Sequence, residues 1–178
     1  LAATGLIASI VGIAIVKIQS AKSPASALRS GTLLAPLVFM IMAYFLVNSI
    51  SDIPTSVLWC VLTGALGGVA IGLITEYYTG GSPVKEIAAS GETGPATVMI
   101  TGLSVGMQSV VIPVSILAII ILISTSIASN IGITGVYGVG IAAVGMLSTV
   151  GITMAIDAYG PIADNAGGIA EMSGMGEE

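Results

Sequence analysis

The chain has 178 residues, of which 55% are hydrophobic and only 7% are charged, and its mean hydropathy is +1.09. Soluble domains carry about 25% charged residues, so four Lys or Arg and nine Asp or Glu are too few to cover a soluble fold of this length. The composition therefore predicts an integral membrane protein, and the net charge of −5 argues against nucleic-acid binding, which needs a basic surface.

Cysteine and histidine usage narrows the chemistry further. Cys60 is the single cysteine, so no internal disulfide can form, and a chain without histidine is poorly suited to zinc. We interpret Cys60, which lies in an apolar run, as a small buried residue rather than a nucleophile. The chain begins at Leu1 inside an apolar run and lacks the basic segment of a signal peptide, which predicts a fragment of a longer protein.

The predicted fold class is all-α: a polytopic bundle of transmembrane helices forming a single region over 1–178. Each span needs roughly 20 apolar residues. Charges and turn residues separate six of them in chain order, at approximately 1–16, 32–50, 56–75, 93–112, 113–129 and 137–164. The first connector holds Lys17, Lys22 and Arg29, and the connector after the third span holds Lys85, Glu86 and Glu92.

The stretch from Thr93 to Ile156 carries no charge, and its length fits three spans better than two. Pro113 and the polar run STSIASNIGITG divide it. A single helix over 93–129 would be unusually long and would contain Pro113, which removes a helical hydrogen bond, so we expect two spans there.

The last predicted helix, 137–164, would be about 42 Å long against a hydrocarbon core of roughly 30 Å. Asp157 and Asp164 should therefore lie at or beyond the membrane edge. Pro161 has no N–H to donate to the Asp157 carbonyl, and a kink with a free oxygen beside the acids would suit cation coordination. The alternative is that Pro161 simply ends the span.

Three carboxylates, Asp157, Asp164 and Glu171, follow one another at seven-residue intervals. Seven residues is just under two helical turns, so the three share one face, each roughly 10 Å above the last. Carboxylates near a bilayer are costly, so this spacing predicts a cation or metal site. Gly167 and Gly168 could offer backbone N–H groups to an anion, and the neighbouring Asp164 could hold Mg²⁺ on a phosphate.

Small and polar residues recur at helical spacing in the apolar segments. Ridges that predict close helix packing are Gly64, Gly68 and Gly72; Gly102 and Gly106; and Gly138, Ala142, Gly145 and Thr149. A polar stripe comprises Thr97, Thr101, Ser104 and Gln108. Its side chains either hydrogen-bond to neighbouring helices or line an ion path.

The run DAYGPIADNAGGIAEMSGM, residues 157–175, resembles the membrane-bound, ion-pumping inorganic pyrophosphatases. The segments PASALRSGT, ITEYYTGGSPVKEIA, GETGPATVMITGLSVGMQS and YGVGIAAVGMLSTVGIT support the resemblance in the order of the family. One departure is Val98, where the family usually has Asn after GPAT.

The resemblance implies a protein of 16 transmembrane helices, of which this chain is the middle, from the end of the sixth through the eleventh. It implies pyrophosphate hydrolysis with Mg²⁺ on the cytosolic side, transport of H⁺ or Na⁺ across the membrane, and a homodimer; K⁺ dependence stays open. Asp164 matches a family aspartate that binds Mg²⁺. Asp157, Asn165, Gly167, Gly168 and Glu171 match motif positions without an assigned role.

No catalytic residue is assigned within the chain, because the water-activating aspartate, the gating glutamate and the other acidic segments of the family lie outside it. The fragment alone is expected to be inactive. From the residues alone, a secondary ion transporter or channel using the acids as a cation relay ranks first, and a non-catalytic membrane scaffold second.

The charge bias conflicts with the resemblance. With six spans, all four Lys and Arg fall in or beside 17–31 and 77–92, on the face opposite the acidic end. The positive-inside rule would then place the acidic end outside the cell, whereas the resemblance places it in the cytosol.

Overall fold

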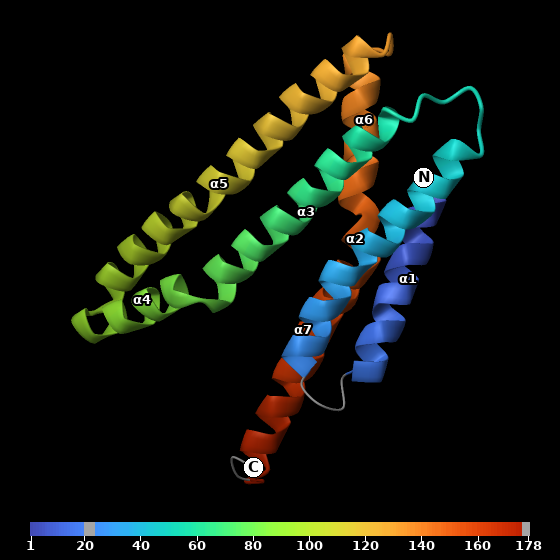
Figure 1. Ribbon diagram of the computed structural model, residues 1–178. Coiled ribbons are helices and arrows are strands. Elements are labelled where there is room, and N and C mark those ends of the chain that lie inside the picture. The colour runs from blue at the N-terminus through green and yellow to red at the C-terminus, as the bar shows by residue number, and fades with distance from the viewer. Residues whose placement is uncertain (20–23, 176–178) are drawn as a thin grey trace. The chain divides into compact units, whose positions relative to one another are not determined.

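The computed structural model describes residues 1–19 and 24–175, and its regular elements there are all helical (Figure 1). This confirms the predicted fold class. The helices are α1 (Ala2–Gln19), α2 (Pro24–Asn48), α3 (Val57–Gly80), α4 (Ser82–Ser90), α5 (Pro95–Asn130), α6 (Gly135–Met146) and α7 (Val150–Met172). Two single 3₁₀ turns complete the order, η1 (Gly91–Thr93) before α5 and η2 (Leu147–Thr149) between α6 and α7.

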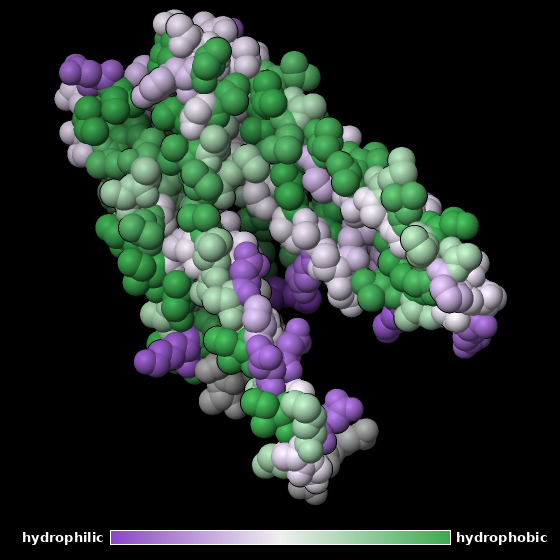
Figure 2. Space-filling view, turned by 180° about the vertical axis from the view of Figure 1, so that it is seen from behind, coloured by the Kyte–Doolittle hydropathy of each residue, from purple (hydrophilic) through white to green (hydrophobic). Residues whose placement is uncertain are grey.

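Five helical stretches in the described residues are long and apolar enough to cross a membrane. They are Ala2–Gln19, Ala27–Asn48, Val57–Thr93, Pro95–Asn130 and Gly135–Met172. Figure 2 shows hydrophobic and weakly polar atoms over most of the visible surface of the helices, with strongly hydrophilic atoms in a few groups. Such a surface requires a lipid solvent, so the protein is a multi-pass integral membrane protein.

The predicted division of 93–129 at Pro113 is wrong, because α5 runs as one helix from Pro95 to Asn130 with Pro113 inside it. Proline removes one helical hydrogen bond. If the chain left the helical conformation within lipid, however, several backbone groups would be exposed where no water can bind them. Proline is therefore tolerated inside membrane helices. Among the described residues, five helical stretches are therefore long and apolar enough to be spans, where six were expected.

The last predicted span also differs from expectation. Instead of one helix over 137–164, α6 ends at Met146 and α7 begins at Val150, with η2 between them. Pro161 does not end the helix, since α7 continues through it to Met172; that Pro161 ends the membrane span stays a prediction.

One compact unit of the chain, Ala43–Leu147, is held together by close contacts at glycines. A Cβ on Gly64 would collide with the backbone of Ala142, one on Gly145 with the carbonyl of Val61, and one on Gly138 with the carbonyl of Ser124. These contacts join α3 to α6 and α6 to α5. They confirm the predicted packing role of Gly64, Gly138 and Gly145, whereas a Cβ on Gly72, predicted in the same ridge as Gly64, would meet no described atom within 4 Å.

Cys60 lies in this packed region. Its side chain is buried, and its Sγ lies 3.8 Å from the carbonyl oxygen of Ser124 on α5. The interpretation of Cys60 as a buried packing residue is confirmed.

The Gly102–Gly106 ridge on α5 behaves differently. Within the described residues no atom comes within 4 Å of a Cβ placed on either glycine, and Leu103 and Met107 beside them are exposed. The expected partner of this ridge is not among the described residues. The role of the polar stripe stays a prediction, although Thr97 hydrogen-bonds locally to Gly94 O and to Thr93 Oγ1.

The other compact unit comprises residues 1–42 and 148–178, of which 20–23 and 176–178 lie outside the described residues. Small residues line one buried face of α1: Gly5, Ala8, Ser9 and Gly12. A Cβ on Gly12 would lie 3.1 Å from the Cβ of Ala35 on α2 and 3.6 Å from the Cδ1 of Ile152 on α7. The fully buried Phe39 of α2 and Ile152 of α7 supply the large side chains of this core.

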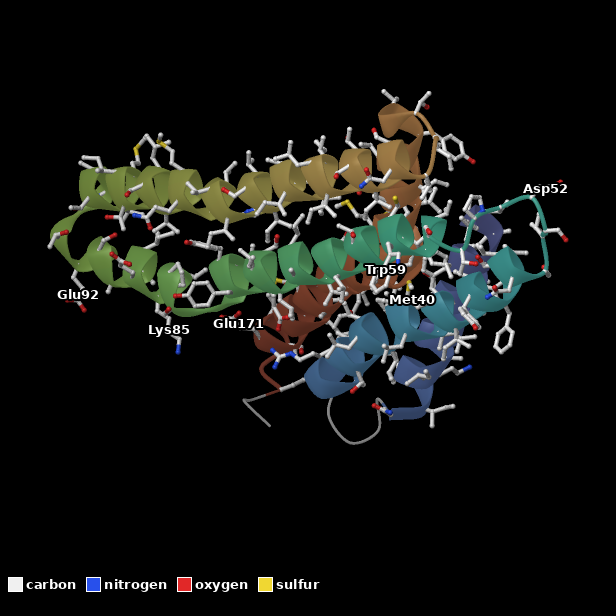
Figure 3. All side chains as sticks on the ribbon, turned by 45° about the horizontal axis from the view of Figure 1, so that its top comes forward. Met40, Asp52, Trp59, Lys85, Glu92 and Glu171 are labelled. Carbon is white, nitrogen blue, oxygen red and sulfur yellow. The ribbon has the colours of Figure 1, made fainter. Side chains whose placement is uncertain are left out.

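Five crossings would also predict which segments of the chain share a membrane side. If each stretch crosses once and so changes side, the end of α1, the start of α2, the α4–η1 segment and the end of α7 share one side, and 49–56 and 131–134 share the other. Figure 3 shows Asp52 in the loop before α3, and Lys85 and Glu92 beyond the opposite end of that helix.

We expect Gly64→Ala to abolish folding of the full-length protein or to lower its melting temperature strongly, because the new methyl group would overlap the Ala142 backbone. Overpacking of this kind costs about 1–3 kcal/mol or more. Gly72→Ala is the matched control, since it lies two turns further along α3 and its Cβ would meet nothing within 4 Å among the described residues. Equal melting temperatures for the two variants would contradict the α3–α6 contact.

Single cysteines introduced into a cysteine-free full-length protein test the five crossings. Cysteines at Lys85 and Glu171 should react with a membrane-impermeant maleimide from one side, and cysteines at Asp52 and Thr134 from the other. Labelling of positions 85 and 171 from opposite sides would restore the six-span arrangement.

Candidate functional site

The candidate site residues lie on α7, the helix that carries the DNAGG run. Asp157, Asp164 and Glu171 all lie within this continuous helix and all have exposed side chains. The helical conformation places the three on one face, as the seven-residue spacing predicted. The face therefore presents three separate carboxylates to the surroundings of the unit.

The three carboxylates do not form one metal site by themselves. Among residues 1–19 and 24–175, no group of three His, Cys, Asp or Glu lies close enough to hold a metal ion. Neighbouring acids on α7 are separated by roughly 10 Å along the axis, whereas two oxygens bound to one Mg²⁺ lie within about 4 Å of each other. Each carboxylate can thus supply ligands to a different ion.

The donor chemistry of Asp164 still fits Mg²⁺. Magnesium prefers hard oxygen ligands, keeps several waters, and commonly binds through one or two carboxylates together with phosphate oxygens. An exposed carboxylate on a regular helix meets that requirement without a closed cage of protein ligands. The remaining ligands would come from water, from a phosphate, or from other parts of the full-length protein.

Asn165 makes a hydrogen bond that was not expected. Its Nδ2 donates to the carbonyl of Pro161, one turn earlier, at 2.8 Å. The bond holds the Asn165 side chain against the helix beside Asp164. An asparagine four residues after a proline was the only signal for it in the sequence, and it is weak because many helical side chains have that spacing.

The expected role of Gly167 and Gly168 as N–H donors to an anion is wrong for this conformation. Both lie deep inside α7, and only the first four N–H groups of a helix are free of helical partners. What the two glycines do provide is an open surface. A Cβ on Gly160, Gly167 or Gly168 would meet no described atom within 4 Å. A ligand or a helix of the remaining protein can therefore approach the backbone closely here.

A second polar feature, at the start of α7, was also not predicted. The fully buried Ser9 of α1 contacts η2 and the first turn of α7 through its hydroxyl group. The only hint in the sequence was the Ser148-Thr149 pair inside an apolar run, which is common in membrane helices.

The whole chain is similar to known proteins. A family model described as "Inorganic H+ pyrophosphatase" matches residues 1–178. A Clostridium tetani protein provisionally named a K(+)-stimulated pyrophosphate-energized sodium pump is 45% identical over 183 residues, which cover 100% of this chain and 27% of that protein. A Bacteroides thetaiotaomicron protein of the same name is 46% identical over 191 residues, covering 100% of this chain and 26% of its own length.

A Methanosarcina mazei protein named a K(+)-insensitive pyrophosphate-energized proton pump is 40% identical over 183 residues, covering 98% of this chain and 26% of that protein. The chain thus spans about a quarter of the length of the curated relatives that it matches.

Because the surface over Gly168 is open, Gly168→Ala should leave the melting temperature of the full-length protein unchanged or raise it slightly. Alanine is more favourable than glycine in a helix by about 1 kcal/mol. Gly145→Ala, whose Cβ would collide with Val61 O, is the packed counterpart and should lower it. A lower melting temperature for Gly168→Ala would show that another part of the full-length protein packs against this glycine.

Proposed function

This chain belongs to the inorganic H⁺ pyrophosphatase family, and on that premise we propose that the full protein hydrolyses pyrophosphate with Mg²⁺ and couples the reaction to transport of H⁺ or Na⁺ across the membrane. The observation that carries the proposal is the family match over 1–178, which includes the DNAGG run with Asp164 exposed on α7. The relatives named above are called sodium or proton pumps energised by pyrophosphate.

Asp164 is the residue that we assign to the metal and the substrate. Its carboxylate would hold Mg²⁺, which when bound neutralises the dense negative charge of pyrophosphate and orients its oxygens. The open backbone at Gly167 and Gly168 leaves room for the substrate to approach the same helix face. Asp157 and Glu171 lie roughly 10 Å to either side along the helix, so they would serve other ions or the transport path.

The five-span arrangement supports this proposal through the charge bias. With five crossings, Lys17 at the end of α1, Arg29 near the start of α2 and Lys85 in α4 would fall on the same side as the acidic end of α7, while Lys22 lies outside the described residues. The positive-inside rule places that side in the cytoplasm. Hydrolysis on the cytosolic side would agree with the charge bias in a five-span arrangement, whereas it conflicts with that bias in a six-span one.

We also propose that the full protein forms a homodimer in the lipid bilayer. K⁺ is a candidate activator, since two of the relatives are named K⁺-stimulated and another K⁺-insensitive. A secondary transporter or a passive scaffold would need none of this chemistry, and the whole-chain family match favours the pump over both.

Asp164→Asn in the full-length protein should lower Mg²⁺-dependent pyrophosphate hydrolysis and ion uptake together, by about 100-fold or more, because one metal ligand supplies several kcal/mol in such sites. Hydrolysis is measured as phosphate release from membranes and transport as ion uptake into vesicles, each with and without K⁺. Asp52→Asn is the matched control, an exposed aspartate in the loop before α3, and should leave both rates unchanged. Unchanged hydrolysis in Asp164→Asn would refute the assignment.

A further inference from the structure

The helix that carries the acids is not continuous with the apolar helix α6 that precedes it. Between α6 and α7 the chain makes the 3₁₀ turn η2, Leu147–Thr149, in place of regular α-helical turns. In a bilayer such a break needs a protein partner for its backbone groups, because lipid offers none. The partner lies on α1.

Ser9 of α1 bonds both to the η2 turn and to the first turn of α7. Its Oγ donates a hydrogen bond to the carbonyl of Ser148 at 2.8 Å and accepts one from the N–H of Gly151 at 3.3 Å. The side chain of Ser9 is 0% exposed. A single hydroxyl therefore uses its donor and an acceptor lone pair to join α1 to η2 and to the first turn of α7.

The approach depends on glycine at position 151. A Cβ placed there would lie 2.6 Å from the Cβ of Ser9 and 3.2 Å from its Oγ, closer than normal van der Waals contact. Only a residue without a side chain lets the α7 backbone come near enough for its N–H to reach the hydroxyl. Ser9 and Gly151 thus form one contact with two requirements, a hydroxyl on α1 and a bare backbone on α7.

We propose that Ser9 is a positioning residue: it clamps the first turn of α7 onto α1 and so holds the acid-bearing part of α7 in its working position. This inference rests on the proposed function, since it acts through Asp164. From Gly151 to Asp164 the helix rises about 20 Å. A tilt of about 5° at the clamp would move Asp164 by about 1.7 Å, and a misplacement of about 1 Å can cost about 100-fold in rate.

Two other buried serines provide matched controls. The hydroxyl groups of Ser148 and Ser124 are buried and have no hydrogen-bond partner among the described residues. Replacing either serine by alanine removes the same atom from an equally buried position without breaking a hydrogen bond of the structure. In Ser148→Ala the carbonyl that accepts from Ser9 is retained, so the clamp itself stays intact.

The experiment compares Ser9→Ala, Ser148→Ala and Ser124→Ala in the full-length membrane protein. Two quantities are measured: amide hydrogen exchange in peptides covering 148–155, and the Mg²⁺ concentration that gives half-maximal pyrophosphate hydrolysis. Ser9→Ala should raise both the exchange rate and the half-maximal Mg²⁺ concentration by about 3- to 10-fold, the factor expected for one hydrogen bond. Both controls should match the unaltered protein.

A double variant separates the hydroxyl from the packing. Gly151→Ala alone should reduce the amount of folded protein, because its methyl group overlaps Ser9. In the double variant Ser9→Gly/Gly151→Ala the overlap is relieved, but the hydroxyl group is still missing. The double variant should therefore fold and behave like Ser9→Ala. Restoration of unaltered exchange and Mg²⁺ dependence in the double variant would overturn the proposal, as would a Ser9→Ala protein that equals Ser148→Ala in both measurements.

The two proposals fail separately. If the unaltered full-length protein does not hydrolyse pyrophosphate, the proposed function is refuted, while hydrogen exchange still decides whether Ser9 clamps α7. If hydrolysis is present and depends on Asp164 but exchange does not respond to Ser9→Ala, the clamp alone is refuted.

Discussion

The absence of water inside a bilayer is the constraint from which most of this structure follows. Backbone N–H and C=O groups there must bond to one another, so the chain stays helical even through Pro36, Pro113 and Pro161. The hydrophobic effect does not draw helices together in lipid, so association depends on close contact. Gly64, Gly138 and Gly145 supply it by letting one backbone touch another.

The same lack of water explains how the buried polar groups are placed. Ser9 is completely buried, yet its hydroxyl is bonded twice, at the one place where the helical hydrogen-bond pattern between α6 and α7 is altered. The carboxylates of α7, by contrast, are exposed. Charge lies where water or a ligand can reach it, and neutral hydroxyl groups support the backbone within.

The sequence was sufficient to predict the helical class, the membrane location, the face shared by Asp157, Asp164 and Glu171, and the glycine contacts of α3 and α6. These features follow from composition and from a period of 3.6 residues, which are local properties. The course of the chain through Pro113 was not predictable in this way, because proline disrupts helices in water and is tolerated in lipid. The Ser9 contact was missed because it joins residues 139 positions apart, and no local pattern records such a pairing.

Gly102 and Gly106 illustrate a further limit of local reasoning. They have the spacing of a helix contact, yet no described residue approaches them. The spacing predicts a surface that lets a neighbour come close, but it does not identify the neighbour. The same holds for Asp164, whose side chain is placed by α7 while its other metal ligands are not supplied by the described residues.

The length of α5 has a consequence for the lipid environment. Its 36 residues extend about 54 Å, whereas a hydrocarbon core of roughly 30 Å crossed at a steep tilt of about 40° accommodates only about 26 of them. Roughly ten residues must then stand in the headgroup region or beyond it, unless the bilayer thickens around the helix. The protein should accordingly prefer membranes with longer acyl chains, and its tilt should respond to their thickness.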